Sequence, residues 1–294
     1  MKHFTCRKAA VFSDIHSNYY ALKACYEDAV GKGAEMFIFL GDYISDLADP
    51  QKTLDLVYEI RKSYPTACLR GNRERYMLDC KKGNITFSKG SKTGSLLYTY
   101  NQLRPQDFAF LESLPMYDEL QINGVCLEIA HGSADDDRFY FEGTEYNADV
   151  LLQQMKYRYF FGGHCHRQYV YRRGDKTVCN PGSIGVPRDH ACATQYAMLE
   201  VDEDVQITSY TITYDIPAMI HRQFESSLIE VAPYWAISIL YDTITGDKYA
   251  MELLESLDER EVLDEQCWRR NAKAMGIGFT EQEILQLFEQ LQRR

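Results

Sequence analysis

The fold is decided by a short stretch near the N-terminus, Ala9-Ala10-Val11-Phe12-Ser13-Asp14-Ile15-His16-Ser17-Asn18. Its apolar half predicts a buried strand, and a helix-like pattern resumes directly after Asn18. Asp14 and His16 therefore stand on the turn at the carboxyl end of a strand, where open α/β sheets bind their ligands. An oxygen and a nitrogen spaced in this way can face one metal ion. Taken alone, the pair fits an ordinary surface turn better, so the metal interpretation depends on what recurs downstream.

Two further strand ends repeat this arrangement. The apolar run at 35–40 predicts a second strand, which ends at Asp42, and the run at 67–69 predicts a third, which ends at Asn72. The helices expected between these strands span residues 19–32 and 51–63. Strand and helix units of about 30 residues are typical of right-handed βαβ crossovers in a parallel sheet. The three polar side chains are therefore expected at one edge of that sheet.

The second half of the chain predicts another sheet. Strands at 119–122 and 125–129 flank Asn123-Gly124, the strongest hairpin turn signal in the sequence. His131 follows this hairpin. Further strands are expected at 159–161, 176–179, 195–201 and 206–214, and helices at 93–103, 105–113 and 148–155, with a loop at 135–146. The predicted fold class is α/β, a four-layer α/β/β/α sandwich of two mixed sheets with an α-helical C-terminal appendage.

The composition changes at Pro217, which divides the chain into two predicted domains, 1–216 and 217–294. The second domain is expected to be helical, with helices near 253–257, 261–275 and 280–291, the last opened by a capping box of Thr280 and Glu283. Its apolar stripes indicate packing either on the first domain or on a second copy of the chain, so a homo-oligomer stays open.

Charge and composition restrict the function. The net charge of −11 argues against tracking of duplex nucleic acid, and no apolar run is long enough for a membrane span. Nine scattered cysteines and a short apolar N-terminus favour free thiols in a cytoplasmic protein. The lysine-rich stretch 81–95 predicts a mobile loop, which is either a solvated connection or a basic lid over a substrate.

Seven candidate metal ligands collect at predicted strand ends: Asp14, His16, Asp42, Asn72, His131, His164 and His166. Carboxylate, amide and imidazole ligands without a thiolate favour two divalent first-row ions, among Mn, Fe, Zn, Co and Ni. Cys165 lies between two candidate histidines, so its side chain is expected to point away from the ions. Backbone carbonyls or carboxylates are expected to hold each imidazole.

The motif order is Asp-x-His, Gly-Asp, Gly-Asn, His-Gly, Gly-His-x-His and Asn-Pro-Gly-Ser, and it spans residues 9–214. It resembles the calcineurin-like binuclear metallophosphoesterases, most of all their small bacterial phosphodiesterase and phosphatase branch. The resemblance implies two divalent ions, manganese favoured. The implied ligands of one ion are Asp14, His16 and His166, those of the other are Asn72, His131 and His164, and Asp42 bridges the two. It also implies in-line attack by a metal-bridging hydroxide, with Asn72 and His131 as catalytic residues. Arg73 is expected as a third catalytic residue, on its own chemistry.

One departure from the family pattern affects catalysis. Many relatives carry a histidine after the Gly-Asn motif, and this chain has Arg73. A guanidinium does not donate a proton at working pH, but it can bind phosphate oxygens bidentately. An ion pair of Arg73 with Glu74 is the alternative. Arg188 is a further candidate for substrate binding, and His190 is a candidate for a substitute acid.

The expected function is hydrolysis of a small phosphodiester or a nucleotide-type phosphate ester. A phosphomonoester, including a phosphoprotein or a dinucleoside polyphosphate, stays open as the substrate. The alternative from another class is a non-catalytic, metal-bound interaction module, and the presence of all seven ligand types argues against it.

Overall fold

We describe the chain from a computed structural model, which covers residues 1–141, 145–258 and 265–293. The loop expected at 135–146 and the helix expected at 261–275 lie partly outside these residues. The helix is described from Glu265 onward, as α11 (Glu265–Ala274). None of the nine cysteines, all of which lie in the described ranges, takes part in a disulfide bond.

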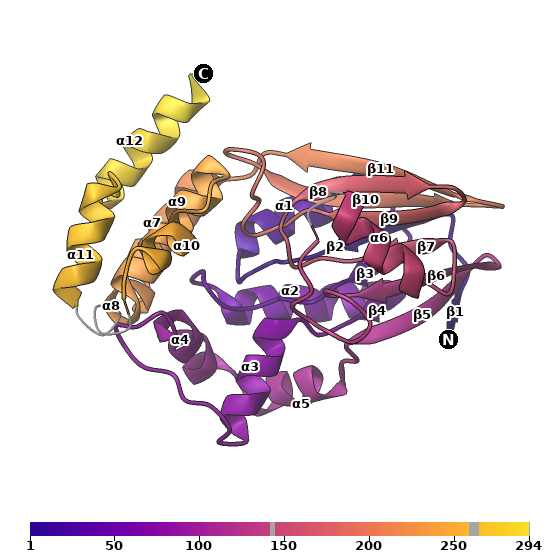
Figure 1. Ribbon diagram of the computed structural model, residues 1–294, viewed down its shortest axis with the longest axis horizontal. Coiled ribbons are helices and arrows are strands. Elements are labelled where there is room, and N and C mark those ends of the chain that lie inside the picture. The colour runs from indigo at the N-terminus through magenta and orange to yellow at the C-terminus, as the bar shows by residue number, and fades with distance from the viewer. Residues whose placement is uncertain (142–144, 259–264, 294) are drawn as a thin grey trace.

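Two mixed β-sheets lie on the side of the molecule opposite the C-terminal helices (Figure 1). The five-stranded sheet has the order β11-β10-β2-β3-β4, and the six-stranded sheet has the order β1-β5-β6-β7-β9-β8. The strands of the first sheet are β2 (Lys8–Phe12), β3 (Met36–Phe39), β4 (Thr66–Cys68), β10 (Thr194–Val201) and β11 (Val205–Ile212). Those of the second are β1 (Lys2–Phe4), β5 (Tyr117–Ile122), β6 (Val125–Ala130), β7 (Tyr159–Phe161), β8 (Gln168–Arg173) and β9 (Lys176–Pro181).

The parallel part of the first sheet confirms the expected βαβ units. β2 pairs in parallel with β3, and β3 with β4. Their side chains are buried on both faces, which explains why they read as continuous apolar runs instead of alternating ones. Val11 and Ile38 point between the sheets, where they meet Leu127 and Phe161 of the second sheet. This apolar layer joins the two sheets.

Helices cover both outer faces. α1 (Tyr19–Gly31) and α2 (Pro50–Ser63) pack on the five-stranded sheet, where Leu22 and Leu54 join the cluster that contains Phe12 and Phe39. On the other side, α6 (Glu145–Gln154) packs through Leu151 against the six-stranded sheet. The four-layer α/β/β/α architecture is therefore confirmed. α3 (Asn72–Lys81), α4 (Gly94–Gln102) and α5 (Pro105–Ser113) follow β4.

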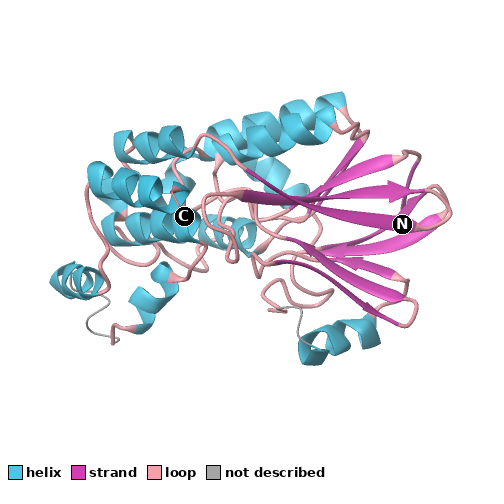
Figure 2. Cartoon of the chain, turned by 90° about the horizontal axis from the view of Figure 1, so that it is seen from above, coloured by secondary structure: helices cyan, strands magenta, loops and turns pink. Residues whose placement is uncertain are grey.

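The C-terminal helices, labelled in Figure 1, gather at one end of the sandwich, and Figure 2 shows the strands at the other end. They are α7 (Ile216–Glu225), α8 (Leu228–Val231), α9 (Pro233–Thr245), α10 (Tyr249–Glu255), α11 and α12 (Glu281–Gln292). Their apolar cluster includes Leu47, Tyr98 and Val186 from the first part of the chain, so these helices pack on the rest of the same chain. The domain boundaries and a homo-oligomer stay predictions. No described helix combines the length and the apolar character that a membrane crossing requires.

β1, α7 and α8 were not expected from the sequence, and three further elements differ from the expectation for reasons that their sequences show. Residues 72–81 form α3, although Met77 and Leu78 are adjacent and give no clear apolar stripe. β8 is a partly exposed edge strand that ends in Arg172 and Arg173, so its pattern is too polar to predict a strand. α9 is buried on nearly all sides, so its sequence lacks the period of an amphipathic helix.

Candidate metal centre

The turns after β2 and β3 hold the first ligand candidates in an unusual backbone conformation. φ is positive at Asp14 (53°), His16 (49°) and Asp42 (53°), and likewise at His164 (66°) and His166 (60°) in the turn after β7. Such angles are uncommon outside glycine and are maintained only where the surroundings impose them. Here the backbone N–H groups of Ile15 and His16 both donate to the Asp42 carbonyl, at 2.8 and 3.0 Å. The two strand ends are thereby tied together.

Two glycines allow the close approach of these turns. A Cβ on Gly71 would lie 2.2 Å from Asp42 Oδ1, and a Cβ on Gly163 would lie 2.0 Å from Ser13 Oγ. Neither distance is possible for a real side chain. The Gly-Asn and Gly-His motifs therefore need glycine for steric reasons, and this accounts for their position beside the ligand candidates.

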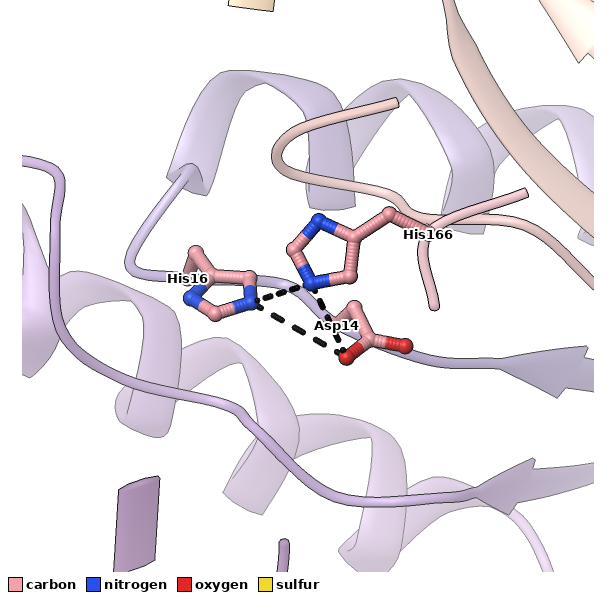
Figure 3. A group of neighbouring side chains, drawn as sticks. All are labelled: Asp14, His16 and His166. Carbon is pink, nitrogen blue, oxygen red and sulfur yellow. Dashed lines mark hydrogen bonds and ion pairs between the residues drawn. The ribbon is translucent and has the colours of Figure 1, made fainter. Parts of the chain in front are cut away.

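Asp14, His16 and His166 form the first cluster, although 150 residues separate the two histidines (Figure 3). His16 Nε2 and His166 Nε2 are 3.0 Å apart. Asp14 Oδ1 lies 3.3 Å from His166 Nε2 and 3.9 Å from His16 Nε2. All three side chains are buried, so the five-stranded and six-stranded sheets contribute to one enclosed group of donors.

Asp42, His131 and His164 form the second cluster. His131 Nε2 is 3.4 Å from Asp42 Oδ2 and 3.2 Å from Asn72 Oδ1. Asp42 Oδ2 is also 3.7 Å from His16 Nε2 in the first cluster. This carboxylate oxygen therefore lies between the two groups.

The donor atoms fit divalent metal ions. His16 Nδ1 donates to Asp46 Oδ2 at 3.0 Å, His131 Nδ1 to the Leu40 carbonyl at 2.9 Å, and His166 Nδ1 to the Val186 carbonyl at 2.8 Å. In each of these three rings Nε2 then faces the cluster, and the partner fixes the ring orientation, as expected from the sequence. For the ring of His164 the expectation stays a prediction. Asp14 Oδ1 is buried among these atoms without a hydrogen-bond partner. A cation would satisfy it.

The thiol of Cys165 points elsewhere. Asn180 Nδ2 donates to Cys165 Sγ at 3.1 Å, and the Cys165 side chain is fully buried. The two clusters therefore present only oxygen and nitrogen atoms, a donor set typical of first-row divalent ions.

The pKa values of the clustered side chains show that the carboxylates favour a positive charge beside them. Burial alone would lower the pKa of His131, but Asp42 and Asp14 outweigh it and raise the pKa to about 10. Burial and the neighbouring His131 lower the pKa of His164 to about 4. Burial would raise the pKa of Asp42, yet His131 and His16 lower it to about 2. The carboxylates thus stay negative and attract positive charge, which protons or metal ions supply.

Asp46 was not anticipated from the sequence, although it connects several parts of the site. It is fully buried, and its Oδ2 accepts from His16 Nδ1 and lies 3.1 Å from Arg73 Nη2. Its Oδ1 accepts from Trp235 Nε1 of α9 at 2.8 Å and from Ser95 Oγ of α4 at 3.1 Å. Nothing in the local sequence separates it from nearby acidic residues such as Asp49.

Glu74 was also missed as a functional residue. It accepts from the backbone N–H groups of Asp42, Tyr43 and Gly71, at 2.8, 2.9 and 2.7 Å. It therefore fixes the turns that carry Asp42 and Asn72, and its contacts are with the backbone. The alternative of an Arg73–Glu74 ion pair is wrong, because Arg73 pairs with Asp46.

Two of the three remaining candidates, Arg73 and Arg188, lie at the site, and His190 does not. A cavity of about 350 Å³ opens beside the clusters, and Arg73 and Arg188 both line it. The Nε atoms of both arginines are buried without a hydrogen-bond partner. His190 lies elsewhere, with its side chain half exposed and in contact with Asp189 and Gln195, so the structure does not bring it into the site. The other lining residues are Asp42, Asn72, Tyr76, Tyr140, His164, His166 and Met251.

The fold and the two clusters define the class of protein: an α/β/β/α sandwich whose sheet ends converge on a candidate divalent-metal centre. The sequence matches the calcineurin-like phosphoesterase superfamily domain over residues 8–204, and the chain belongs to this family. It is therefore a metallophosphoesterase, a hydrolase of phosphate esters, and the resemblance seen in the motifs is confirmed.

Individual proteins are similar to this chain in sequence or in fold. An uncharacterized protein of Methanocaldococcus jannaschii is 26% identical over 239 residues, which cover 75% of this chain and 93% of that protein. The structure of a hypothetical protein from Pyrococcus horikoshii superposes with a TM-score of 0.69 at 19% identity, over 81% of this chain and 99% of that one. A metallophosphoesterase from Sphaerobacter thermophilus gives 0.61 at 21% identity, over 77% and 98%. Because both of these structures are less than 25% identical to this chain in sequence, they support the fold alone.

Proposed function

We propose that this chain hydrolyses a phosphodiester or a nucleotide-type phosphate ester with two divalent metal ions, manganese favoured. The observation that carries the proposal is the position of Asp42 Oδ2, within 3.4 Å of His131 Nε2 and 3.7 Å of His16 Nε2. Asp14, His16 and His166 would hold one ion, Asn72, His131 and His164 the other, and Asp42 both. When bound, such ions supply Lewis acidity toward phosphoryl oxygens and acidify water.

The side chains around the cavity would bind and orient the ester. Arg73 and Arg188 present guanidinium groups beside the clusters, and both can donate to phosphoryl oxygens. Burial would raise the pKa of Asp46, yet the guanidinium of Arg73 and the imidazole of His16 lower it. The carboxylate of Asp46 is therefore negative and holds Arg73 in place. Arg73 would thus bind the phosphoryl group in a fixed orientation and stabilise the charge that develops on it.

Arg73 also favours a diester over a monoester. Hydrolysis forms one P–O bond to the oxygen of water and breaks the bond to the leaving oxygen, which departs with the electron pair. A guanidinium does not protonate that oxygen, so a leaving group that is stable as an anion suits this site best. Free thiols at all nine cysteines are consistent with the proposed cytoplasmic location.

The test compares two chromogenic substrates, a bis-aryl phosphodiester and an aryl phosphomonoester. Protein stripped of metal is reloaded with manganese, and Asp42→Asn serves as the inactive control. Faster turnover of the diester, lost in the variant, is the expected result. Faster turnover of the monoester would move the substrate class to a phosphatase. No turnover of either ester by protein that binds two ions would overturn the proposal in favour of a binding module.

A further inference from the structure

A second cavity, of about 400 Å³, adjoins the cavity beside the metal centre. The two share three lining residues, Arg73, Tyr76 and Met251, so they lie side by side with these side chains between them. The remaining walls of the second cavity are Ile85, Thr86, Phe87, Lys92, Thr93, Leu96 and Trp235. Its surface is mainly apolar and aromatic, in contrast to the charged cluster next to it.

Three separate parts of the chain build this second cavity. Tyr76 comes from α3, and Phe87 comes from the connection between α3 and α4. Trp235 and Met251 come from α9 and α10 of the C-terminal helices. Arg73 and Lys92 place positive charge at the cavity, and Tyr76, Thr86 and Thr93 carry hydroxyl groups. The C-terminal helices therefore complete a space that the rest of the chain leaves open on one side.

Hydrogen bonds hold the walls in position. The indole N–H of Trp235 donates to Asp46 Oδ1 at 2.8 Å, which fixes the ring relative to the site. The N–H of Gly90 donates to the Val231 carbonyl at 2.8 Å, which ties the lysine-rich connection to α8. Phe87 packs edge-on against Tyr100 of α4, with ring centroids 6.2 Å apart. A preformed cavity of this kind binds a rigid group without a large ordering penalty.

We propose that this cavity receives the leaving group of the substrate, and that this group carries a planar aromatic ring such as a nucleoside base or an aryl ring. The proposal rests on the proposed function and deepens it. Arg73 stands between the metal centre and the cavity, so an ester held there directs one substituent into the apolar space. Tyr76, Phe87 and Trp235 supply ring faces and edges for stacking. An aryl alcohol also leaves readily as an anion, which matches a site that has Arg73 where relatives carry an acid. A nucleoside would leave through its less acidic ribose oxygen, so its fit to the cavity rests on the stacking of its base.

The position of the lysine-rich connection agrees with this assignment. Lys92 is exposed at its surface yet lines the cavity together with Arg73. A cation there would attract an ester that carries further negative charge, as a nucleotide does. The alternative of a basic lid next to the substrate is thus favoured over that of a solvated connection.

The first arm of the test uses leaving groups of different shape. Nitrophenyl methyl phosphate and trifluoroethyl methyl phosphate share the same methyl phosphoryl group, so a variant that acts on the cavity changes the ratio of their kcat/KM values. Met251→Glu places a charge in the apolar wall and is expected to lower kcat/KM for the aryl ester about tenfold more than for the alkyl ester. Met275→Glu, at a methionine of similar exposure outside the cavity, is the matched control.

The second arm measures binding without turnover. The chain has two tryptophans, and Trp235 lines the cavity whereas Trp268 is only 1% exposed. Nitrophenylphosphonate, a nitroaromatic quencher that the enzyme does not hydrolyse, is expected to quench the tryptophan fluorescence of wild-type protein, and methylphosphonate is not. Adenosine monophosphate that reverses the quenching would identify a nucleoside as the ring, and reversal by phenylphosphonate alone would identify an aryl group.

The outcomes separate this inference from the proposed function. Quenching without hydrolysis of any ester would support the aromatic cavity and overturn the proposed function. Hydrolysis with no quenching, and with an aryl-to-alkyl ratio that Met251→Glu leaves unchanged, would overturn the cavity assignment and leave the function standing. If Met251→Glu does not fold, the quenching of the wild-type protein still decides the question.

Discussion

At the scale of single residues, Arg73 carries the clearest prediction for catalysis. Its guanidinium lies beside the clusters, and Asp46 holds it at 3.1 Å. Arg73→Ala is expected to lower kcat/KM about 100-fold because a positioned donor for the developing phosphoryl charge is lost. Arg73→Lys should recover only part of the rate, since an ammonium group keeps the charge and lacks the bidentate fork. Steady-state kinetics with the preferred ester measure both.

Arg75 provides a matched control for that measurement. It lies two residues further along α3 and pairs with Asp137 through two hydrogen bonds, at 2.6 and 3.0 Å. Arg75→Ala removes the same side chain without touching the clusters, so its turnover should stay near that of the wild type. An equal loss in Arg73→Ala and Arg75→Ala would assign both effects to the stability of α3.

Asp46 carries a second prediction at this scale, as a positioning residue. Asp46→Asn keeps the size of the side chain but weakens its bonds to His16 and Arg73. We expect metal affinity to fall by about 10–100-fold, the usual effect of removing a carboxylate behind a ligand histidine. Titration of stripped protein with manganese measures this. Asp49→Asn is the control, because Asp49 is also buried and paired to an arginine, Arg222 at 2.8 Å. Equal affinities in wild type and Asp46→Asn would contradict the assignment.

At the scale of elements, α9 carries a buried carboxyl group. Asp242 is 1% exposed, and burial, together with Asp46, raises its pKa to about 8 although Arg188 and the N–H of Ala250 oppose the shift. A folded-state pKa above the unfolded value favours folding while the group is protonated, and that stability is lost as the pH rises toward about 8. Asp242→Asn removes this loss. Its stability relative to the wild type should therefore increase by about 4 kcal/mol between about pH 5 and pH 9.

Denaturant unfolding at the two pH values measures that difference. Asp247→Asn is the control, because this aspartate lies just beyond the end of α9 and is exposed. It should show no pH-dependent difference from the wild type. A constant offset between Asp242→Asn and wild type at both pH values would mean that the carboxyl group is ionised throughout.

Strands and helices of this chain differ in how far the sequence predicts them. Strand ends were predictable, because runs such as Phe37-Ile38-Phe39 are buried on both sides and stop at a glycine that the close approach of two turns requires. The contribution of α9 to the site was not predictable, because an apolar helix without a polar face has no recognisable period of apolar residues. Trp235 reaches Asp46 across 189 positions of sequence, so only the folded chain brings them together. The metal ligands stand in short motifs that follow one another in a recognisable order along the chain. The residues that orient these ligands, such as Asp46, belong to no such motif.

At the scale of the whole molecule, the candidate ligands join the two sheets. Asp14, Asp42 and Asn72 follow strands of the five-stranded sheet, and His131 and His166 follow strands of the six-stranded sheet. Bound ions would therefore cross-link the layers, and metal should stabilise the entire fold. At a thousandfold excess over the dissociation constant, linkage gives about 4 kcal/mol. Thermal unfolding of stripped and manganese-loaded protein is expected to show a clear rise in Tm.

That stabilisation should depend on pH with a defined sign. In the absence of metal, Asp42 and Asp14 raise the pKa of His131 to about 10, so its proton is bound across the neutral range. A metal ion at Nε2 must displace this proton, and each proton released makes metal affinity rise with pH. The increase in Tm on adding manganese should therefore be larger at about pH 8 than at about pH 6. His221→Gln, a change at an exposed histidine outside the clusters, should leave the difference intact. Asp42→Asn should remove most of the difference between the two pH values. In the wild type, an equal rise in Tm at both pH values would contradict metal binding through His131.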